Sequence, residues 1–391
     1  MTHRFLRVVL ALTVILVFST GAFALPYTAT EVINKFAFNA AKVLGSKPGD
    51  FFFSPYSILS AIGMAYAGAN TSTAQEFENV LGLSRTNQAS FGDLIRDIEK
   101  SEFLSAANRV WLRNGLNLRQ AYRDDISLYY GSTLGELDFE NQTQESRKII
   151  NDWVSEKTNG RIKDLLQKLE PDIQMVLTNA IYFNAEWLNK FNAKSTAPKK
   201  FYIDEKNTTD VSMMRAYREY MFAADGDFKI IRLPYKGYRL SMIAVLTPKG
   251  LEDKLLTIDA ETFMNWESSL TEYDVDLWLP KFKTEKRYEM KNLFKAMGVR
   301  LAFSNFADFS GITDDEKLKI DEVIHQTFID VDEDKTEAAA ATAVTMIRAT
   351  ALPVQEHKPK AEFHADHPFM YFIMDNYTKT ILFVGRQTFA K

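Results

Sequence analysis

The chain has 391 residues, of which 46% are hydrophobic and 25% charged, so it holds enough apolar material for one large domain or two ordinary ones. A formal net charge of −4 and the lack of any run of basic residues argue against nucleic acid as a partner. Cysteine is absent, which excludes disulfides and any chemistry that uses a thiol.

The N-terminus has the pattern of a secretory signal peptide. Arg4 and Arg7 make a positive start, residues 8–18 form an apolar run, and Ala22-Phe23-Ala24 is a small-x-small cleavage site. We therefore expect residues 1–24 to be removed and the mature protein to be secreted, either outside the cell or into a bacterial envelope. The alternative is a membrane anchor, but about 11 apolar residues fall short of the roughly 20 that a spanning helix requires.

The first part of the mature chain mixes helical and strand patterns. Three phenylalanines, Phe51 to Phe53, precede Ser54-Pro55 and predict a buried strand that stops where proline cannot donate a hydrogen bond. Ser54 and Ser57 then stand near a helix start, where hydroxyl side chains commonly act as caps. Apolar spacing predicts helices over residues 28–45, 58–68, 72–83 and 87–100, and strands over residues 104–116 and 133–139.

The middle of the chain contains its most apolar strand. Residues 149–159 predict an amphipathic helix that ends at Asn159-Gly160. Met175–Phe183 is apolar on both faces, so we expect it in the centre of a sheet that is covered on both sides. Asn179 is then a buried amide that must find hydrogen-bond partners, of which neighbouring backbone groups are the simplest.

The second half of the chain is mainly β. Its patterns predict strands over residues 228–233, 238–246, 275–282, 369–374 and 381–384, and helices over residues 260–268 and 289–297. The last two strands face each other across a turn at residues 375–378. Without internal repeats or a clear linker, this mixture predicts one large α+β domain over residues 25–391.

An alanine-rich stretch, Glu333 to Thr345, has two conflicting patterns. Ala and Glu have high helix propensity, and Thr336 could cap the first turn of a helix. Alternate residues, however, would share one face of a strand, and their side chains are all small enough to enter a crowded sheet. These residues are Thr336, Ala338, Ala340, Thr342 and Val344. A segment with two such options is a candidate conformational switch.

The sequence gives little support for catalysis, and we expect neither an enzyme nor a bound cofactor. There is no G-x-S-x-G elbow, no phosphate-binding P-loop and no thiol nucleophile. His325 follows two apolar residues, where a lone histidine is commonly a structural hydrogen-bonding group. His357, His364 and His367 raise the question of a metal site, but they lack the helical context of a metallohydrolase, so we expect no metal.

Several motifs, in order and spacing over essentially the whole mature chain, resemble those of the serpins. They are F-S-P-Y-S-I at 53–58, N-D-W-V-S-E-K-T-N-G-R-I-K-D-L-L at 151–166, L-T-N-A-I-Y-F-N-A-E-W at 177–187, T-E-A-A-A-A-T-A at 336–343, A-D-H-P-F at 365–369 and L-F-V-G-R at 382–386. The resemblance implies three β-sheets, surrounding helices and an exposed reactive-centre loop over about residues 333–356.

The resemblance also implies a mechanism. In serpins a target protease cleaves the exposed loop and forms an acyl-enzyme, and the loop then inserts into the main sheet and distorts the protease. The alternative is a non-inhibitory serpin that acts as a carrier or chaperone. The partner of an inhibitor would be a serine protease of elastase-like or trypsin-like specificity, a cysteine protease being a further option, and we expect a monomer.

Individual positions match functional positions of the family. Ser54, Ser57, Asn179 and His325 match the polar shutter beneath the point where the sheet parts, and Trp187 matches the breach residue at its top. The hinge comprises Glu333, Lys335, Thr336, Glu337, Ala338, Ala339, Ala340, Ala341 and Thr342. Lys335 departs from the pattern, because inhibitory serpins usually carry glycine there, and lysine lacks glycine's freedom at positive φ.

The reactive bond is predicted from the spacing that inhibitory serpins use. Counting Glu333 as the first of seventeen positions, the seventeenth is Ala349, so the reactive bond is predicted between Ala349 and Thr350. The small side chain of Ala349 suits an elastase-like pocket. The alternative reactive bond lies one residue earlier, between Arg348 and Ala349. The guanidinium of Arg348 would suit an acidic, trypsin-like pocket.

Overall fold

The computed structural model describes residues 28–100, 103–336 and 358–390, so the predicted signal peptide lies outside the described residues. The helices are α1 (Ala29–Gly45), α2 (Pro55–Gly68), α3 (Thr71–Leu81), α4 (Gln88–Glu99), α5 (Gln120–Tyr130), α6 (Thr143–Lys157), α7 (Ala260–Ser269) and α8 (Lys291–Met297). The strands before residue 250 are β1 (Phe51–Phe53), β2 (Leu104–Arg113), β3 (Gly135–Leu137), β4 (Met175–Phe183), β5 (Ala185–Glu186), β6 (Ala197–Tyr202), β7 (Thr208–Asp225), β8 (Phe228–Pro234) and β9 (Leu240–Leu246). Those after it are β10 (Thr271–Pro280), β11 (Phe282–Glu289), β12 (Glu322–Val331), β13 (Lys335–Thr336), β14 (Lys360–His364), β15 (Phe369–Asp375) and β16 (Ile381–Gln387).

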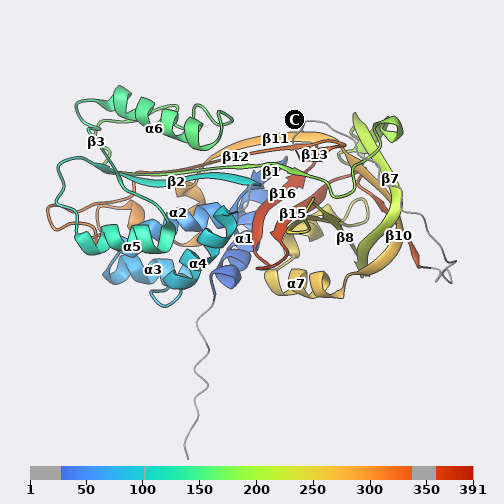
Figure 1. Cartoon of the computed structure of the whole chain (residues 1–391), viewed down its shortest axis with the longest axis horizontal. Helices are drawn as coiled ribbons and strands as arrows, with labels where there is room; N and C mark the ends of the chain where they lie inside the picture. The colour runs from blue at the N-terminus through green and yellow to red at the C-terminus, as the bar shows by residue number, and fades with distance from the viewer. Residues whose placement is uncertain (1–27, 101–102, 337–357, 391) are drawn as a thin grey trace, which may run out of the picture.

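These strands form two hydrogen-bonded sheets. A seven-stranded sheet has the order β3-β2-β4-β12-β13-β5, with β11 paired to β12. A nine-stranded sheet has the order β1-β16-β15-β9-β8-β7-β10-β14, with β6 paired to β7. In Figure 1 α6 lies on one side of the long seven-stranded sheet and α1 to α5 on the other. The α+β class predicted from the sequence is confirmed.

Strand β7 explains why two sheets are present where three were expected. It is 18 residues long. Its first part pairs with β6, its middle pairs with β10, and Met221 to Asp225 pair with β8. The continuous strand therefore joins two of the expected sheets into one. The sequence pattern did not isolate it, because the adjacent buried residues Met213 and Met214 interrupt its alternation.

The first helices form where capping groups are present. Thr28 makes a capping box with Glu31 at the start of α1. Helix α2 begins at Pro55, three residues before the predicted start, because proline has a suitable φ for the first helical position and Ser54 Oγ accepts the N–H of Ser57. The remaining predicted helices and strands are present with shifted ends. Helix α5 and several strands, among them β12 and β14, were not predicted.

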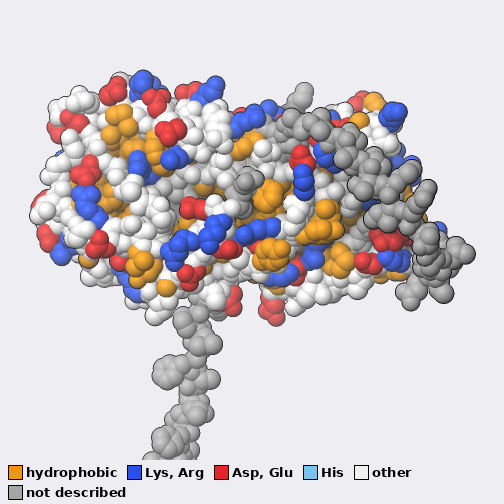
Figure 2. All heavy atoms as spheres, viewed as in Figure 1, with side chains coloured by type: hydrophobic (Ala, Val, Ile, Leu, Met, Phe, Trp, Pro, Cys, Tyr) orange, Lys and Arg blue, Asp and Glu red, His pale blue; other side chains and the backbone are white. Residues whose placement is uncertain are grey.

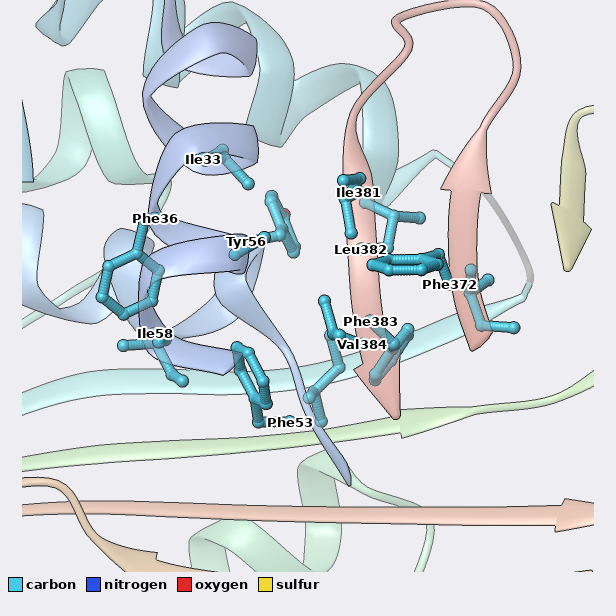
Figure 3. Close-up of a cluster of buried hydrophobic side chains, with 14 of the residues drawn as sticks. Ile33, Phe36, Phe53, Tyr56, Ile58, Phe372, Ile381, Leu382, Phe383 and Val384 are labelled. Carbon is cyan, nitrogen blue, oxygen red and sulfur yellow. The ribbon is translucent and has the colours of Figure 1, made fainter. Parts of the chain in front are cut away.

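The core joins the beginning of the described chain to its end. Figure 3 shows side chains from α1, β1 and α2 packed against β15 and β16. The rings of Phe52 and Phe383 stack with centroids 5.2 Å apart, and β1 pairs antiparallel with β16. On its other side β16 pairs with β15, where Gly385 lies opposite Tyr371, and a Cβ at Gly385 would overlap the Tyr371 ring.

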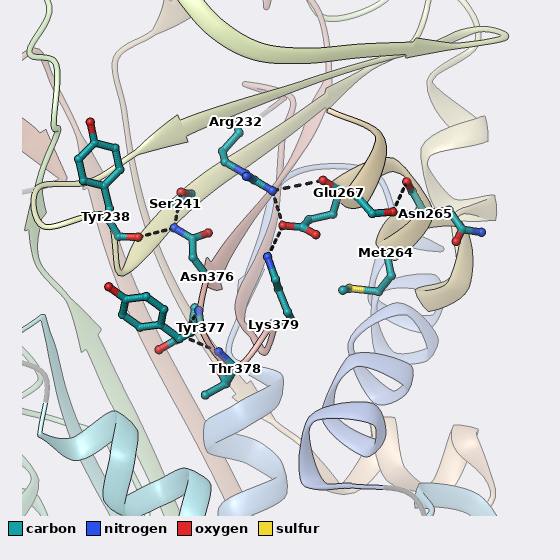
Figure 4. Close-up of polar contacts among 12 residues, drawn as sticks. Arg232, Tyr238, Ser241, Met264, Asn265, Glu267, Asn376, Tyr377, Thr378 and Lys379 are labelled. Carbon is teal, nitrogen blue, oxygen red and sulfur yellow. Dashed lines mark hydrogen bonds and ion pairs between the residues drawn. The ribbon is translucent and has the colours of Figure 1, made fainter. Parts of the chain in front are cut away.

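A buried ion-pair group attaches α7 to the nine-stranded sheet. Glu267 of α7 is 6% exposed and contacts both Arg232 of β8 and Lys379, whose Nζ lies 2.7 Å from its Oε1 (Figure 4). Asn376 donates to the backbone oxygen of Tyr238 at 2.7 Å and to Ser241 Oγ at 2.8 Å. These contacts fix the turn between β15 and β16 against β8 and β9.

Candidate functional site

The seam between β4 and β12 lies at the centre of the seven-stranded sheet. The two strands are parallel, with Asn179 opposite His325 and Tyr182 opposite Phe328. Every residue of β4 is buried, so the prediction of a central strand is confirmed. Parting the two strands would break a row of backbone hydrogen bonds and expose apolar surface on both faces.

Beneath the seam, a polar cluster consists of Ser54, Ser57, Asn108, Asn179 and His325. His325 Nε2 accepts from the Ser54 N–H at 3.0 Å, and its Nδ1 contacts Asn179 Oδ1. Asn179 Nδ2 donates to Ser57 Oγ and to Asn108 Oδ1, each at 2.6 Å. The structure thus brings together all four residues that resemble the shutter, and Asn179 bonds side chains from three elements rather than neighbouring backbone alone.

His325 is neutral in this cluster. It is completely buried, and burial lowers its pKa to about 3. Because Nε2 accepts from the backbone of Ser54, the ring proton is on Nδ1 and points to Asn179 Oδ1. The ring therefore links α2 to both strands of the seam.

Asn108 was not predicted from the sequence. It lies on β2 directly opposite Asn179 and accepts from Ser57 Oγ at 2.9 Å. Residues 106–112 are apolar except for Asn108 and Arg109. This interruption is the only sequence signal for Asn108. Its partner depends on the register between β2 and β4, which the sequence pattern does not specify.

At the top of the seam, Glu333 is held on both sides. Its Oε2 lies 2.5 Å from Lys281 Nζ, and its Oε1 accepts from Thr196 Oγ1 at 2.8 Å. Burial acts to raise the pKa of Glu333, but these hydrogen bonds outweigh it and lower the pKa below its ordinary value. Lys281 and Thr196 were not predicted, because nothing in their local sequence indicates a partner so distant in the chain.

Trp187 secures the neighbouring backbone. Its ring stacks on Tyr235 with centroids 4.5 Å apart, and its Nε1 donates to the backbone oxygen of Asp332 at 2.9 Å. The Trp187 N–H also donates to the backbone oxygen of Asp334 at 3.2 Å. The residue that resembles the breach tryptophan therefore contacts the segment that leads into the hinge.

The start of the hinge is already a strand. Lys335 and Thr336 form β13, with Thr336 opposite Val331 of β12 and opposite Ala185 of β5. Of the two patterns in the alanine-rich stretch, the strand pattern holds at these two positions. The other predicted hinge residues, Glu337 to Thr342, and both candidate bonds, Ala349-Thr350 and Arg348-Ala349, lie outside the described residues.

The opposite face of the sheet is covered by α6 and the segment after it. Ile150 and Val154 of α6 belong to a second buried cluster, which also contains Val176 and Ala180 of β4 and Ile324 of β12. Arg287 of β11 donates through Nε to the backbone oxygen of Leu165 at 2.8 Å. This layer spans the seam and must shift if the two strands part.

The other two described histidines have structural partners. His367 contacts Asp366 through Nδ1 and the backbone oxygen of Thr247 through Nε2, and His364 stacks on Trp278. His357 lies outside the described residues. Within residues 28–100, 103–336 and 358–390, no group of three or more potential ligands is arranged to hold a metal ion. No helix in this part of the chain is long and apolar enough to cross a bilayer.

We predict that acid destabilises the protein through His325. The unfolded-state pKa is about 6.5 and the native-state pKa about 3, so between these values the unfolded state binds a proton that the native state does not. The contribution of His325 is complete above pH 6.5, and it decreases by about 1.4 kcal/mol per pH unit as the pH falls. Urea unfolding midpoints over this range should show a shallower slope for His325→Gln than for the natural protein. An unchanged slope for His325→Gln would contradict the assignment.

We also predict that Lys281→Ala loosens the hinge. Removing the lysine leaves Glu333, whose side chain is 14% exposed, without its cation, at a cost of about 1–2 kcal/mol. Amide exchange at β13 should become faster and the urea midpoint should fall. Lys286→Ala on β11 is the matched control, since Lys286 forms no ion pair with a described residue. Equal behaviour of the two variants would show that the Glu333 contact does not hold the hinge.

Comparison with known proteins agrees with this geometry. Residues 31–388 match the family model of the serpins, described as serine protease inhibitors. An uncharacterized serpin-like protein of Thermococcus kodakarensis is 39% identical over 91% of this chain and 84% of its own length. The leukocyte elastase inhibitor of Xenopus laevis is 34% identical, over 86% of this chain and 92% of its own.

The solved structures support the same assignment. Uncleaved ovalbumin, at 27% identity, superposes with a TM-score of 0.81, and the match covers 93% of this chain and all of ovalbumin. The family model, the related sequences and the shared architecture agree over nearly all of the described residues. The chain belongs to the serpin family.

Proposed function

We propose that this protein is a secreted inhibitor of serine proteases that acts as a suicide substrate. The observation that carries the proposal is β13, where the first hinge residues already lie as a strand between β12 and β5, at the upper end of the β4–β12 seam. In the proposed reaction, a protease cleaves the loop and forms an ester to it. The loop then continues from β13 down the seam as a new strand, before the ester is hydrolysed.

The side chains of the hinge suit this insertion. Ala338, Ala340 and Thr342 continue the face of Thr336, and small side chains enter a packed sheet without overfilling it. The added strand would gain backbone hydrogen bonds and bury surface on both sides, so the uncleaved fold is a kinetically trapped state. The polar cluster beneath the seam and the α6 layer above it set the barrier to opening.

Lys335 is compatible with this mechanism at the level of the backbone. It lies in an extended strand opposite Glu186, and every L-residue adopts that conformation. The usual glycine at this position is therefore not required for positive φ in the state described here.

Specificity follows from the loop sequence. Ala349-Thr350 would direct the protein to elastase-like proteases, and Arg348-Ala349 to trypsin-like ones; a cysteine protease is a further option. Basic and acidic side chains are interspersed over the face shown in Figure 2, so we assign partner choice to the loop rather than to a charged surface. We propose secretion from the N-terminal pattern, and a monomer as the active form.

The second candidate function is that of a non-inhibitory carrier or chaperone. The departure at Lys335 and the close match to ovalbumin favour it, since the family includes non-inhibitory members. The two functions differ in one physical property. An inhibitor gains a strand after loop cleavage and melts at a higher temperature, whereas a protein that does not insert its loop shows no such gain.

We predict a covalent complex with an elastase-like or a trypsin-like serine protease, visible as a band on a denaturing gel. The complex should be absent with protease whose active-site serine is blocked. Mass spectrometry of the released C-terminal peptide should show a first residue of Thr350, whereas a start at Ala349 would assign the bond to Arg348. Loop cleavage across a protease panel, with every protease left active, would contradict inhibition.

We predict that Thr342→Arg converts the protein from an inhibitor into a substrate. The new strand would have to bury an unpaired charge, so insertion should become slower than hydrolysis of the ester. The ratio of cleaved protein to complex should rise by more than about tenfold, which corresponds to roughly 1.4 kcal/mol in the barrier. The matched control is Thr342→Val, which changes the same side chain to a similar volume without adding a charge. Unchanged complex formation by Thr342→Arg would argue against strand insertion.

A further inference from the structure

The described chain resumes after the loop at Lys358, and this lysine is held by two carboxylates. Its Nζ lies 2.7 Å from Glu219 Oε2 and 2.7 Å from Glu272 Oε2. Glu219 belongs to β7 and Glu272 to β10, which are neighbouring antiparallel strands with Asp274 opposite Glu219. Since Glu272 and Asp274 are two residues apart, both glutamates lie on the same face of the sheet, and one lysine can bridge them.

Among the described strands, the backbone that follows Lys358 pairs on one side only. The Asp274 N–H donates to the backbone oxygen of Pro359 at 2.9 Å, and β14 then runs parallel to β10 as the last strand in the order of this sheet. His364 at the far end of β14 contacts Asp276 at 3.3 Å. The C-terminal end of the loop is thus attached by a single strand pairing, with Lys358 at the point where that pairing begins.

The two ends of the loop have different tasks in the proposed function. After cleavage, the N-terminal side enters the seven-stranded sheet and the C-terminal side stays on β14. Without cleavage, complete insertion would pull the chain from its C-terminal end, so the contacts of Lys358 would break before those of β14. An anchor at Lys358 therefore opposes unproductive insertion and leaves the productive route free.

We propose that Lys358, bridged by Glu219 and Glu272, is a positioning residue that anchors the C-terminal end of the reactive loop and keeps the uncleaved loop out of the seam. This inference rests on the proposed inhibitory function. Hydrogen bonds and charges from Glu219 and Glu272 raise the pKa of Lys358, so it stays charged wherever the protein is stable. Glu219 and Glu272 are 59% and 61% exposed, so salt should weaken the anchor.

The test measures spontaneous loss of inhibitory capacity. Freshly purified Lys358→Ala should form the covalent complex, and on incubation without protease it should lose that capacity about 2- to 5-fold faster than the natural protein. The double variant Glu219→Gln/Glu272→Gln should match it, and Lys358→Arg should restore the natural rate. High salt should accelerate the loss in the natural protein but not in Lys358→Ala.

The matched control is Lys360→Ala, which removes a charge two residues further along the chain, at the first residue of β14. Lys360 forms no ion pair with a described residue, so this variant should lose capacity at the natural rate. Equal rates for Lys358→Ala and the natural protein, or equal acceleration by both alanine variants, would overturn the proposal.

A second readout separates this proposal from the proposed function. Amide exchange in β14 should be faster in Lys358→Ala than in Lys360→Ala, and this measurement requires no protease. If the natural protein formed no covalent complex but exchange differed as expected, inhibition would be wrong and the anchor would stand. If the complex formed but exchange and lifetime were unchanged, the anchor alone would be wrong.

Discussion

The hydrogen bond between His325 and Asn179 is the contact on which the rest of the structure depends. It crosses the β4–β12 seam, which opens in the proposed mechanism, and both side chains are completely buried. A buried polar contact is costly to break because each partner would lose hydrogen bonds in a place that water does not reach. The seam is therefore closed by a few specific groups rather than by apolar packing alone, and a few groups can also exchange partners when the sheet parts.

The hinge and the polar cluster act at opposite ends of the same seam. Glu333 and Trp187 hold the upper end, where β13 has already entered. The cluster holds the strands farther down, between α2 and the seam. In the proposed mechanism, energy stored in the uncleaved fold is retained by these contacts at separate places, and each place can be weakened by one substitution. A protein that works in this way is sensitive to single mutations far from its loop.

Much of the fold could be predicted from the sequence, and the reasons are local. Met175–Phe183 is apolar at nearly every position, and Phe51 to Phe53 end at a proline, so both strands follow from short patterns. Ser54, Ser57, Asn179 and His325 were expected to meet only because of the family resemblance. Asn108, Lys281 and Thr196 could not be predicted, because their contacts depend on strand register and on partners far away in the chain. Local propensity alone could not decide between helix and strand for Lys335 and Thr336, where pairing with β12 and β5 makes the choice.

The pairing of β1 with β16 has a consequence for how the protein is made. Phe52 stacks on Phe383, so the first described elements cannot complete their packing until the last strand has left the ribosome. Such long sequence separations slow folding, and partly made chains expose unpaired strand edges in the meantime. During that interval the alanine-rich segment is translated after β12 but before β14, β15 and β16 exist. Under the proposed mechanism, a chain that reaches the uncleaved state must finish its nine-stranded sheet before that segment can enter the seam, so the order of synthesis would be part of how the inhibitor is obtained.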